Sequence, residues 1–202
     1  MSTSTAKITR MLTDKVEVAT ERVISGKGLI ASQPIRRGEV VWQPDEGAAR
    51  RTGAELQLLP PDNTHCQIGV DLFVYVEPAA WCYNHSCDPN TFLEDGRQVA
   101  ARDIHAGEEV TYDYGIHEIR WSWGFDCSCG SASCRRQVSS RDYLDRRLMA
   151  RAGVHAPHHA RVAAEAAGAA VRVAYRTRRL RRAAGRWLRL MLPAPLRRLL
   201  RS

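Results

Sequence analysis

The sequence predicts a mostly β body that is followed by a helical C-terminal extension. Between Val16 and about Tyr114, apolar runs of four to seven residues alternate with glycine and proline turn signals, a pattern typical of all-β domains. Residues 161–192 contain no proline and are rich in alanine, arginine and leucine, so they predict a long helix that ends before Pro193. A chain of 202 residues, 44% of them hydrophobic, can form one domain with its own core and an appendage.

The predicted strands of the body are apolar runs bounded by turn residues. They cover residues 16–20, 28–32, 39–43, 66–70, 72–77, 98–102 and 108–114. The stretch 47–63 interrupts this rhythm and predicts a short helix and a loop. After the body, residues 138–152 predict a helix with Ser139 or Ser140 as its N-cap, and the composition of residues 153–160 predicts a linker.

Charge is distributed unevenly along the chain. The formal net charge is +8, but residues 151–202 hold 13 arginines, no lysine and a single acid, Glu165. In the predicted helix of residues 161–192, an apolar stripe lies beside a basic face. Three partners are open for the Arg-rich helical tail of residues 161–202: a nucleic acid, an anionic membrane surface, or a protein surface, including the body of this chain.

Composition excludes several classes of protein. No apolar run reaches the roughly 18 residues that a membrane span needs, and the first residues lack the apolar stretch of a signal peptide. Six cysteines in 202 residues are too few for a small disulfide-stabilised domain. We therefore expect a cytoplasmic protein with reduced thiols. Its alanine and arginine content is typical of a high-GC bacterial coding sequence.

Three cysteines lie close together in the pattern C-x-C-x₄-C. Cys127, Cys129 and Cys134 share a glycine-containing loop, and thiolates are favoured zinc ligands. Zinc takes four ligands, so another cysteine, a histidine or a water molecule must complete the site. The cysteine candidates for that position are Cys66, Cys82 and Cys87. The alternative is a set of buried thiols or a redox pair.

A dense polar motif follows one of the strand-like stretches. Residues 84–90 read Asn-His-Ser-Cys-Asp-Pro-Asn, which alone is equally consistent with a turn and with a ligand-binding loop. Residues 26–29 (GKGL) precede it, and residues 107–114 (GEEVTYDY) and the three cysteines follow it. In this order the four segments resemble a SET-domain methyltransferase with a post-SET zinc segment. The resemblance places the SET domain at residues 15–126 and the post-SET zinc segment at residues 127–137.

The resemblance implies a fold and a set of site residues. The fold is a SET-type β-clip with a pseudoknot that contains residues 107–114 and the NHSC loop. Its S-adenosylmethionine site would use Lys27, Gly28, Leu29, Asn84 and His85. Tyr114 corresponds to the active-site tyrosine and Tyr112 to the position that tunes how many methyl groups are added. Cys87 would complete a structural Cys₄ zinc site with Cys127, Cys129 and Cys134.

The function implied is S-adenosylmethionine-dependent transfer of a methyl group to a lysine ε-amine of a protein substrate. Positioning can supply much of the rate of such a transfer, and a narrow aromatic channel favours the neutral amine by desolvation. Two alternatives are a catalytically inactive SET scaffold that binds a partner or nucleic acid through the basic tail, and an enzyme that methylates a small-molecule amine.

The sequence departs from the family pattern at three places. Residues 81–83 (Trp-Cys-Tyr) replace the usual Arg-Phe before NHSC, Arg-Arg replaces Arg-Gly at residues 135–136, and the insert at residues 47–66 is short. Three aromatic residues are candidates for covering the channel or the adenine, with packing as the alternative: Trp121, Trp123 and Phe125. The histidines outside the motif are expected at the surface or in turns: His65, His105, His117, His155, His158 and His159.

Overall fold

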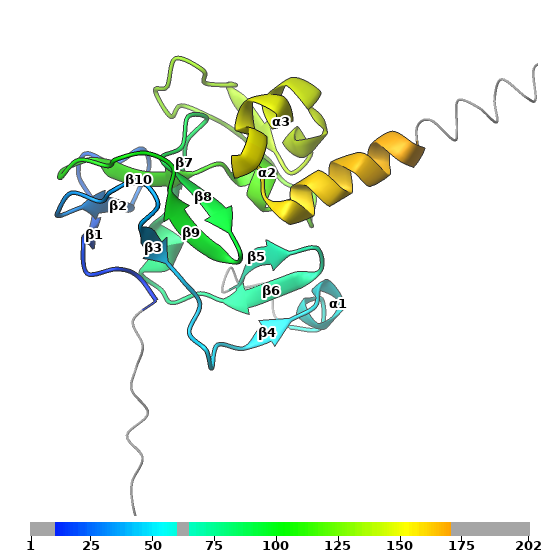
Figure 1. Cartoon of the computed structure of the whole chain (residues 1–202), viewed down its shortest axis with the longest axis horizontal. Helices are drawn as coiled ribbons and strands as arrows, with labels where there is room; N and C mark the ends of the chain where they lie inside the picture. Colours follow the sequence, from blue (N-terminus) through cyan, green and yellow to red (C-terminus); the bar gives the residue numbers. More distant parts are fainter. Residues whose placement is uncertain (1–10, 60–64, 171–202) are drawn as a thin grey trace, which may run out of the picture. The chain divides into compact units, whose positions relative to one another are not determined.

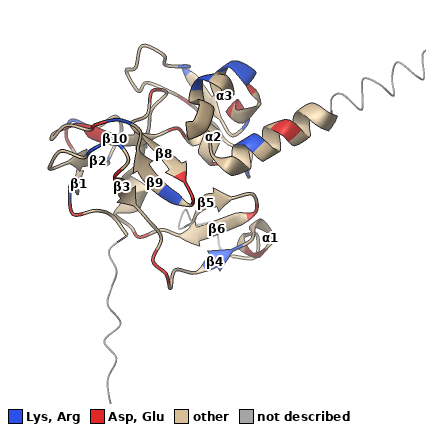
Figure 2. Ribbon diagram, viewed as in Figure 1, with Lys and Arg blue, Asp and Glu red and all other residues tan. Residues whose placement is uncertain are grey.

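The computed structural model describes residues 11–59 and 65–170 (Figure 1). The chain divides into two compact units, residues 1–163 and residues 164–202. Residues 158–170 are helical and include Arg161 and Glu165; Figure 2 colours basic residues blue and acidic residues red along the ribbon. The remainder of the predicted Arg-rich tail lies outside the described residues. Within the described ranges, no helix has the length and apolar character needed to cross a membrane.

The largest sheet joins the segments that carry the sequence motifs. Its strands are β1 (Val16–Ala19), β2 (Gly28–Ala31), β10 (Glu109–Tyr112) and β7 (Asn84–His85), in that order. β2 is antiparallel to both of its neighbours, and β10 is parallel to β7, with Thr111 opposite Asn84 and Tyr112 opposite His85. This parallel pairing places the NHSC motif beside the strand that leads to Tyr114.

Three smaller sheets complete the β structure of the described residues. One contains β3 (Val40–Trp42), β9 (Arg97–Ala100) and β8 (Thr91–Glu94), the second contains β4 (Arg50–Arg51), β6 (Leu72–Tyr75) and β5 (His65–Gly69), and the third pairs β11 (Gly124–Asp126) with β12 (Gln137–Ser139). The helices of the body are short: α1 (Gly53–Leu56), α2 (Tyr114–His117) and α3 (Arg146–Ala152), with 3₁₀ turns at Ala80–Cys82, Asp142–Leu144 and Gly153–His155. The predicted mostly β fold is confirmed.

The main core is formed by the apolar residues that predicted the strands. Leu29 and Val110 are fully buried where β2 meets β10, and Val41 and Val74 bring β3 and β6 into the same cluster. Burying a side chain of this size contributes about 1.5–3 kcal/mol. The core therefore fixes β2 and β10, and with them the motifs at their ends.

The helix predicted over residues 138–152 is wrong in its first half. Residues 137–139 instead form β12 and pair with β11, so Ser139 and Ser140 do not cap a helix. The helix begins after Asp145, whose carboxylate accepts hydrogen bonds from the backbone amides of Arg147 (2.7 Å) and Leu148 (3.2 Å). A strand partner distant in sequence overrode the local helical preference.

The predicted linker at residues 153–160 and two of the predicted surface histidines also need correction. The segment contains a 3₁₀ turn and the start of a helix, and Ala156, His159 and Ala160 are buried. Nε2 of His159 donates a hydrogen bond to the backbone oxygen of His117 (2.8 Å), and His117 is itself buried. The two alanines bury small apolar side chains and His159 supplies a hydrogen-bond donor, so the segment packs against the body instead of forming a linker.

The buried His117 predicts a dependence of stability on pH. Burial, together with the nearby His159, lowers the pKa of His117 from 6.5 to about 3, so the folded protein binds fewer protons at this residue than the unfolded chain does between these pH values. The contribution of neutral His117 to the free energy of unfolding is therefore complete above about pH 7 and is lost as the pH falls below 6.5. From the two pKa values, the free energy of unfolding falls by about 2 kcal/mol between pH 7 and pH 5.

The measurement is a urea unfolding titration of the wild type and of His117→Gln at both pH values. The comparison is needed because burial raises the pKa of Glu118 to about 7, which stabilises the fold on acidification. We expect the stability of the variant to fall about 2 kcal/mol less than that of the wild type on acidification. Parallel pH profiles would show that His117 is not buried in its neutral form.

Candidate active site and metal centre

Four cysteines from two distant segments meet at one point. The sulfur atoms of Cys87, Cys127, Cys129 and Cys134 all lie within 4.8 Å of one another, and those of Cys87 and Cys127 are 3.9 Å apart. Sulfurs at about 2.3 Å from a tetrahedral zinc ion are separated by about 3.8 Å. The donor set and its spacing thus fit a Cys₄ site, with Cys87 as the fourth member.

Backbone amides support two of these sulfurs as thiolates. The amide of Arg135 donates to Sγ of Cys87 (3.3 Å), and the amide of Cys87 donates to Sγ of Cys129 (3.5 Å). Burial raises the pKa of Cys87 to about 12, so a thiolate at this position needs a bound cation to compensate its charge. Four protein ligands leave no open position, so a metal held here is structural.

His85 connects the cysteine cluster to Tyr114. Its Nε2 lies 3.3 Å from Sγ of Cys87, and its Nδ1 accepts a hydrogen bond from the backbone amide of Tyr114 (3.2 Å). Burial lowers the pKa of His85 to about 4, although Asp113 lies 3.6 Å away and acts in the opposite direction. The ring is therefore neutral at pH 7, with its proton on Nε2, facing the sulfur.

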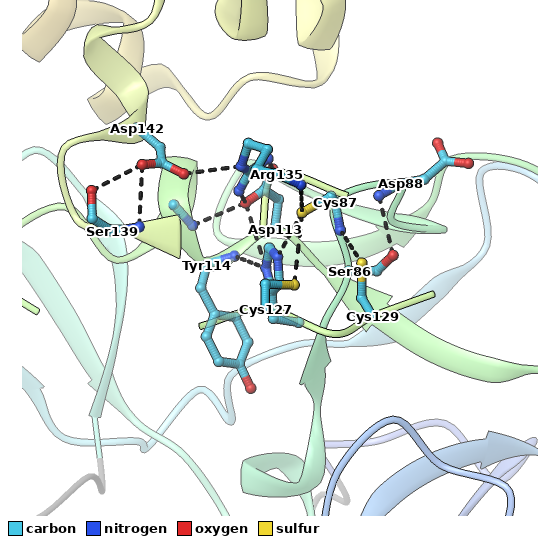
Figure 3. A network of polar contacts seen from close by, with 12 residues as sticks. Ser86, Cys87, Asp88, Asp113, Tyr114, Cys127, Cys129, Arg135, Ser139 and Asp142 are labelled. Carbon is cyan, nitrogen blue, oxygen red and sulfur yellow. Dashed lines mark hydrogen bonds and ion pairs between the residues drawn. The ribbon is translucent and has the colours of Figure 1, made fainter. Parts of the chain in front are cut away.

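Arg135 forms a second connection (Figure 3). Its guanidinium donates two hydrogen bonds to the buried carboxylate of Asp113 (2.6 and 2.7 Å), and its Nε lies 3.0 Å from the carboxylate of Asp142. Asp113 is the N-cap of α2 and accepts from the amide of Gly115 (3.0 Å). Because Tyr114 is the first residue of α2, a charge-assisted network holds the cysteine loop and the tyrosine together.

An aromatic cavity of about 780 Å³ opens beside Tyr114. Tyr112 and Tyr114 line it, with ring centroids 4.7 Å apart, and the hydroxyl of Tyr114 donates a hydrogen bond to the backbone oxygen of Tyr83. The wall is completed by apolar and aromatic residues from several loops, among them Leu56, Leu59, Val76, Trp81, Trp121 and Trp123. The cavity is large enough for an extended side chain and its flanking residues.

A separate polar cluster surrounds the loop before β2. The amide nitrogen of Asn84 donates to the backbone oxygens of Ser25 and Lys27 (both 3.0 Å) and to the carboxylate of Glu109 (2.7 Å). The other oxygen of Glu109 accepts from the amide of Ile24 (2.7 Å). A Cβ at Gly28 would lie 2.4 Å from this carboxylate, which explains the glycine.

The structure brings the residues expected at the cofactor site together around this loop. Lys27 is exposed and Asn84 is half-buried, whereas Leu29 and His85 are buried and can offer only backbone groups to a ligand. Asn84 Oδ1 has no hydrogen-bond partner among the described residues. The assignment of these five residues to a cofactor stays a prediction. Of the three aromatic residues expected to cover the channel or the adenine, Trp121 and Trp123 line the cavity. Phe125 instead packs on His85, with ring centroids 5.5 Å apart.

Sequence reasoning missed three polar residues of the site. Glu109 connects β10 to the loop before β2, and an acid within an apolar strand was the available signal. Tyr83 lines the cavity, and its buried hydroxyl has no hydrogen-bond partner in the described part of the chain. The departure from the Arg-Phe pattern at residues 81–83 was the signal for this region. Glu118 also lines the cavity, and no motif marks it.

Comparisons with known proteins agree with this geometry. Residues 26–115 match the family model described as "SET domain". The chain is 28% identical over 130 residues to "Histone-lysine N-methyltransferase ASHH3" of Arabidopsis thaliana, a match that covers 56% of this chain and 35% of that protein. It is 41% identical over 71 residues to "Histone-lysine N-methyltransferase SET5" of Scheffersomyces stipitis, across 27% of this chain and 14% of that one.

A solved structure, "KRYPTONITE in complex with mCHG DNA and SAH", matches 60% of this chain and 28% of its own with a TM-score of 0.45 and 24% identity. The chain spans about a third of the length of its Arabidopsis relative. The family match covers the strands that carry the GKGL, NHSC and GEEVTYDY motifs, so the chain carries a SET domain over residues 26–115.

Proposed function

We propose that the protein transfers a methyl group from S-adenosylmethionine to the ε-amine of a lysine in a protein substrate. The observation that carries the proposal is the position of Tyr114. Its backbone is held by His85 of the NHSC motif, while its hydroxyl and ring face an aromatic cavity. The curated relatives are named as histone-lysine methyltransferases, which supports lysine as the acceptor.

The residues of the cavity suit an amine that must be deprotonated and held in line. Aromatic walls disfavour an ammonium ion that loses its hydration, which lowers the pKa of an entering amine. They also attract a methylated ammonium through the faces of the rings. Burial raises the pKa of Tyr114, so its hydroxyl stays protonated at neutral pH and acts as a hydrogen-bonding group.

The loop before β2 suits the cofactor. S-adenosylmethionine would supply an electrophilic methyl group on a positively charged sulfur. Oδ1 of Asn84 can accept a hydrogen bond from an ammonium group, and the exposed backbone around Lys27 can approach a ligand closely because Gly26 lacks a side chain. Zinc at the cysteine cluster would hold the segment around β11 and β12 against this site.

The test is transfer of radiolabelled methyl groups from S-adenosylmethionine to purified core histones and, separately, to free L-lysine. Label that mass spectrometry locates on lysine side chains of a protein supports the proposal. Label on the free amino acid alone would indicate a small-molecule methyltransferase. No label on either acceptor, with measurable cofactor binding and one zinc ion per chain, would contradict the proposed acceptor class. No label and no cofactor binding would favour a scaffold role.

We expect substitution of Asn84 by alanine to weaken the binding of S-adenosylmethionine. The change removes the Oδ1 acceptor, the two hydrogen bonds to the backbone oxygens of Ser25 and Lys27, and the hydrogen bond to the Glu109 carboxylate. We expect calorimetry to show a dissociation constant for S-adenosylmethionine raised at least about tenfold, since hydrogen bonds to charged groups contribute about 1.5–3 kcal/mol. Asn63→Ala, outside the motif, is the control. Unchanged affinity in Asn84→Ala would place the cofactor elsewhere.

A further inference from the structure

The aromatic cavity contains a charged group that neither the motifs nor the comparisons assign. Glu118 follows α2 and lines the cavity together with Tyr112 and Tyr114. No lysine or arginine among the described residues lines this cavity, and none of them forms an ion pair with Glu118. Among the described residues, the acid therefore has no lysine or arginine beside it in a mostly aromatic wall.

The hydrogen bonding of Glu118 leaves capacity for a ligand. The backbone amide of Gln67 donates to one carboxylate oxygen at 3.4 Å, a long contact, and the other oxygen has no hydrogen-bond partner among the described residues. Burial raises the pKa of Glu118 to about 7. The side chain is half-buried in the cavity wall, so the carboxyl can accept a hydrogen bond from a group that enters the cavity.

The rest of the cavity wall is mainly aromatic and apolar. The hydroxyl of Tyr83, which also lines the cavity, is buried and has no hydrogen-bond partner among the described residues, but it is shielded from the cavity surface and offers no contact to a ligand. A carboxylate that accepts hydrogen bonds within an aromatic wall matches the end of an alkylammonium chain.

We propose that Glu118 binds the acceptor lysine as its ammonium form and receives its proton. This inference rests on the proposed function, which places a lysine side chain in the cavity. In the step, one N–H bond of the ammonium breaks, its electron pair stays on nitrogen, and the proton forms an O–H bond with the Glu118 carboxylate. The neutral amine is left with the lone pair that methyl transfer requires, and the carboxylic acid later returns its proton to water.

The surroundings of Glu118 set the direction of this transfer. A lysine amine has a pKa of about 10.4 in water, but an aromatic cavity lowers it toward that of the carboxyl. Burial and then the Glu118 charge raise the pKa values of Cys66 and Tyr112, so these groups stay neutral and do not compete for the proton. The titratable groups that face Glu118 across the cavity and an adjoining small void are His65, Cys66, Tyr83, Tyr112, Tyr114 and His117.

The test compares Glu118→Gln with the wild type and with Glu17→Gln, an exposed position on β1. Glutamine keeps an acceptor for the Gln67 amide but cannot take a proton. We expect kcat/KM for histone methylation to fall about 100-fold at pH 7.5 in Glu118→Gln, within the range of acid–base catalysis. Activity should return as the pH approaches 10, where free lysine loses its proton, while the wild type declines only below about pH 7. A Glu118→Gln profile within twofold of the wild type across this range would overturn the proposal.

A binding measurement separates this inference from the proposed function. The probe is n-butylammonium chloride, which mimics the lysine side chain, and the readout is the fluorescence of the cavity tryptophans at pH 8. We expect binding to the wild type and to Glu17→Gln, and at least tenfold weaker binding to Glu118→Gln. Equal binding to all three proteins, or none to the wild type, contradicts the proposal. Glu118-dependent binding without methyl transfer to any lysine would retain the ammonium site and reject the methyltransferase.

Discussion

Removal of zinc is expected to abolish methyl transfer and to destabilise the fold. A strong chelator, or Cys127→Ser, would leave the buried Cys87 and the half-buried Cys129 without a common ion. Structural zinc sites contribute on the order of 10 kcal/mol of binding free energy, which becomes folding free energy. We expect the melting temperature to fall by about 30 °C, given roughly 3 °C per kcal/mol for a chain of this size.

The loss of activity follows from the contacts between the cluster and Tyr114. His85 lies against the sulfur of Cys87 and accepts the Tyr114 amide, and Arg135, next to Cys134, holds the Asp113 cap of the Tyr114 helix. Without the ion, both connections lose their anchor. A zinc ion held by the four cysteines would thus be coupled to Tyr114 through these contacts.

The measurement is zinc content by atomic emission, followed by thermal unfolding and methyl transfer of the wild type, Cys127→Ser and Cys82→Ser. Cys82 is half-buried and lies outside the cluster, so its variant controls for the loss of a thiol. We expect one zinc ion per chain in the wild type and in Cys82→Ser. Full activity of metal-free protein would show that the cluster does not position Tyr114.

Local patterns were sufficient for much of the fold. The apolar runs at residues 28–32 and 108–114 predict β2 and β10 because burial on the core side selects these residues directly. β7 was not predicted, since a strand of two residues has no alternation, and it exists because its backbone pairs with β10. The first half of the predicted helix 138–152 failed for the same reason, as β12 depends on β11.

The residues of the candidate site also fall into two groups, those that a local motif predicts and those that only the three-dimensional fold defines. Residues within motifs, such as Asn84 and Cys87, could be predicted because their order along the chain carries the resemblance. Glu118 could not be predicted, since no motif contains it and its role arises from what surrounds it in three dimensions. The burial of His117 and His159 likewise depends on a contact between segments 42 residues apart.

Tyr114→Phe is expected to reduce kcat about 100-fold or more while the protein stays folded. The change removes only the hydroxyl, which donates to the backbone oxygen of Tyr83 at the cavity wall. The ring contacts with Tyr112 and His85, at 4.7 and 5.4 Å between centroids, remain. Loss of one hydrogen bond costs about 1 kcal/mol of stability, whereas a positioned polar group at a reacting centre is worth about 2.7–4 kcal/mol in the transition state.

The prediction can be separated from a structural effect by three readouts. Methyl transfer to core histones should fall, the dissociation constant of S-adenosylmethionine should change less than about threefold, and the melting temperature should fall by no more than a few degrees. Tyr75→Phe, on the exposed side of β6, is the matched control and should leave all three unchanged.

Because burial keeps the Tyr114 hydroxyl protonated, Tyr114→Phe should lose rate at every pH without shifting the pH profile. A shifted profile would instead identify Tyr114 as the proton acceptor and remove that role from Glu118. The two variants therefore distinguish the group that aligns the amine from the group that deprotonates it.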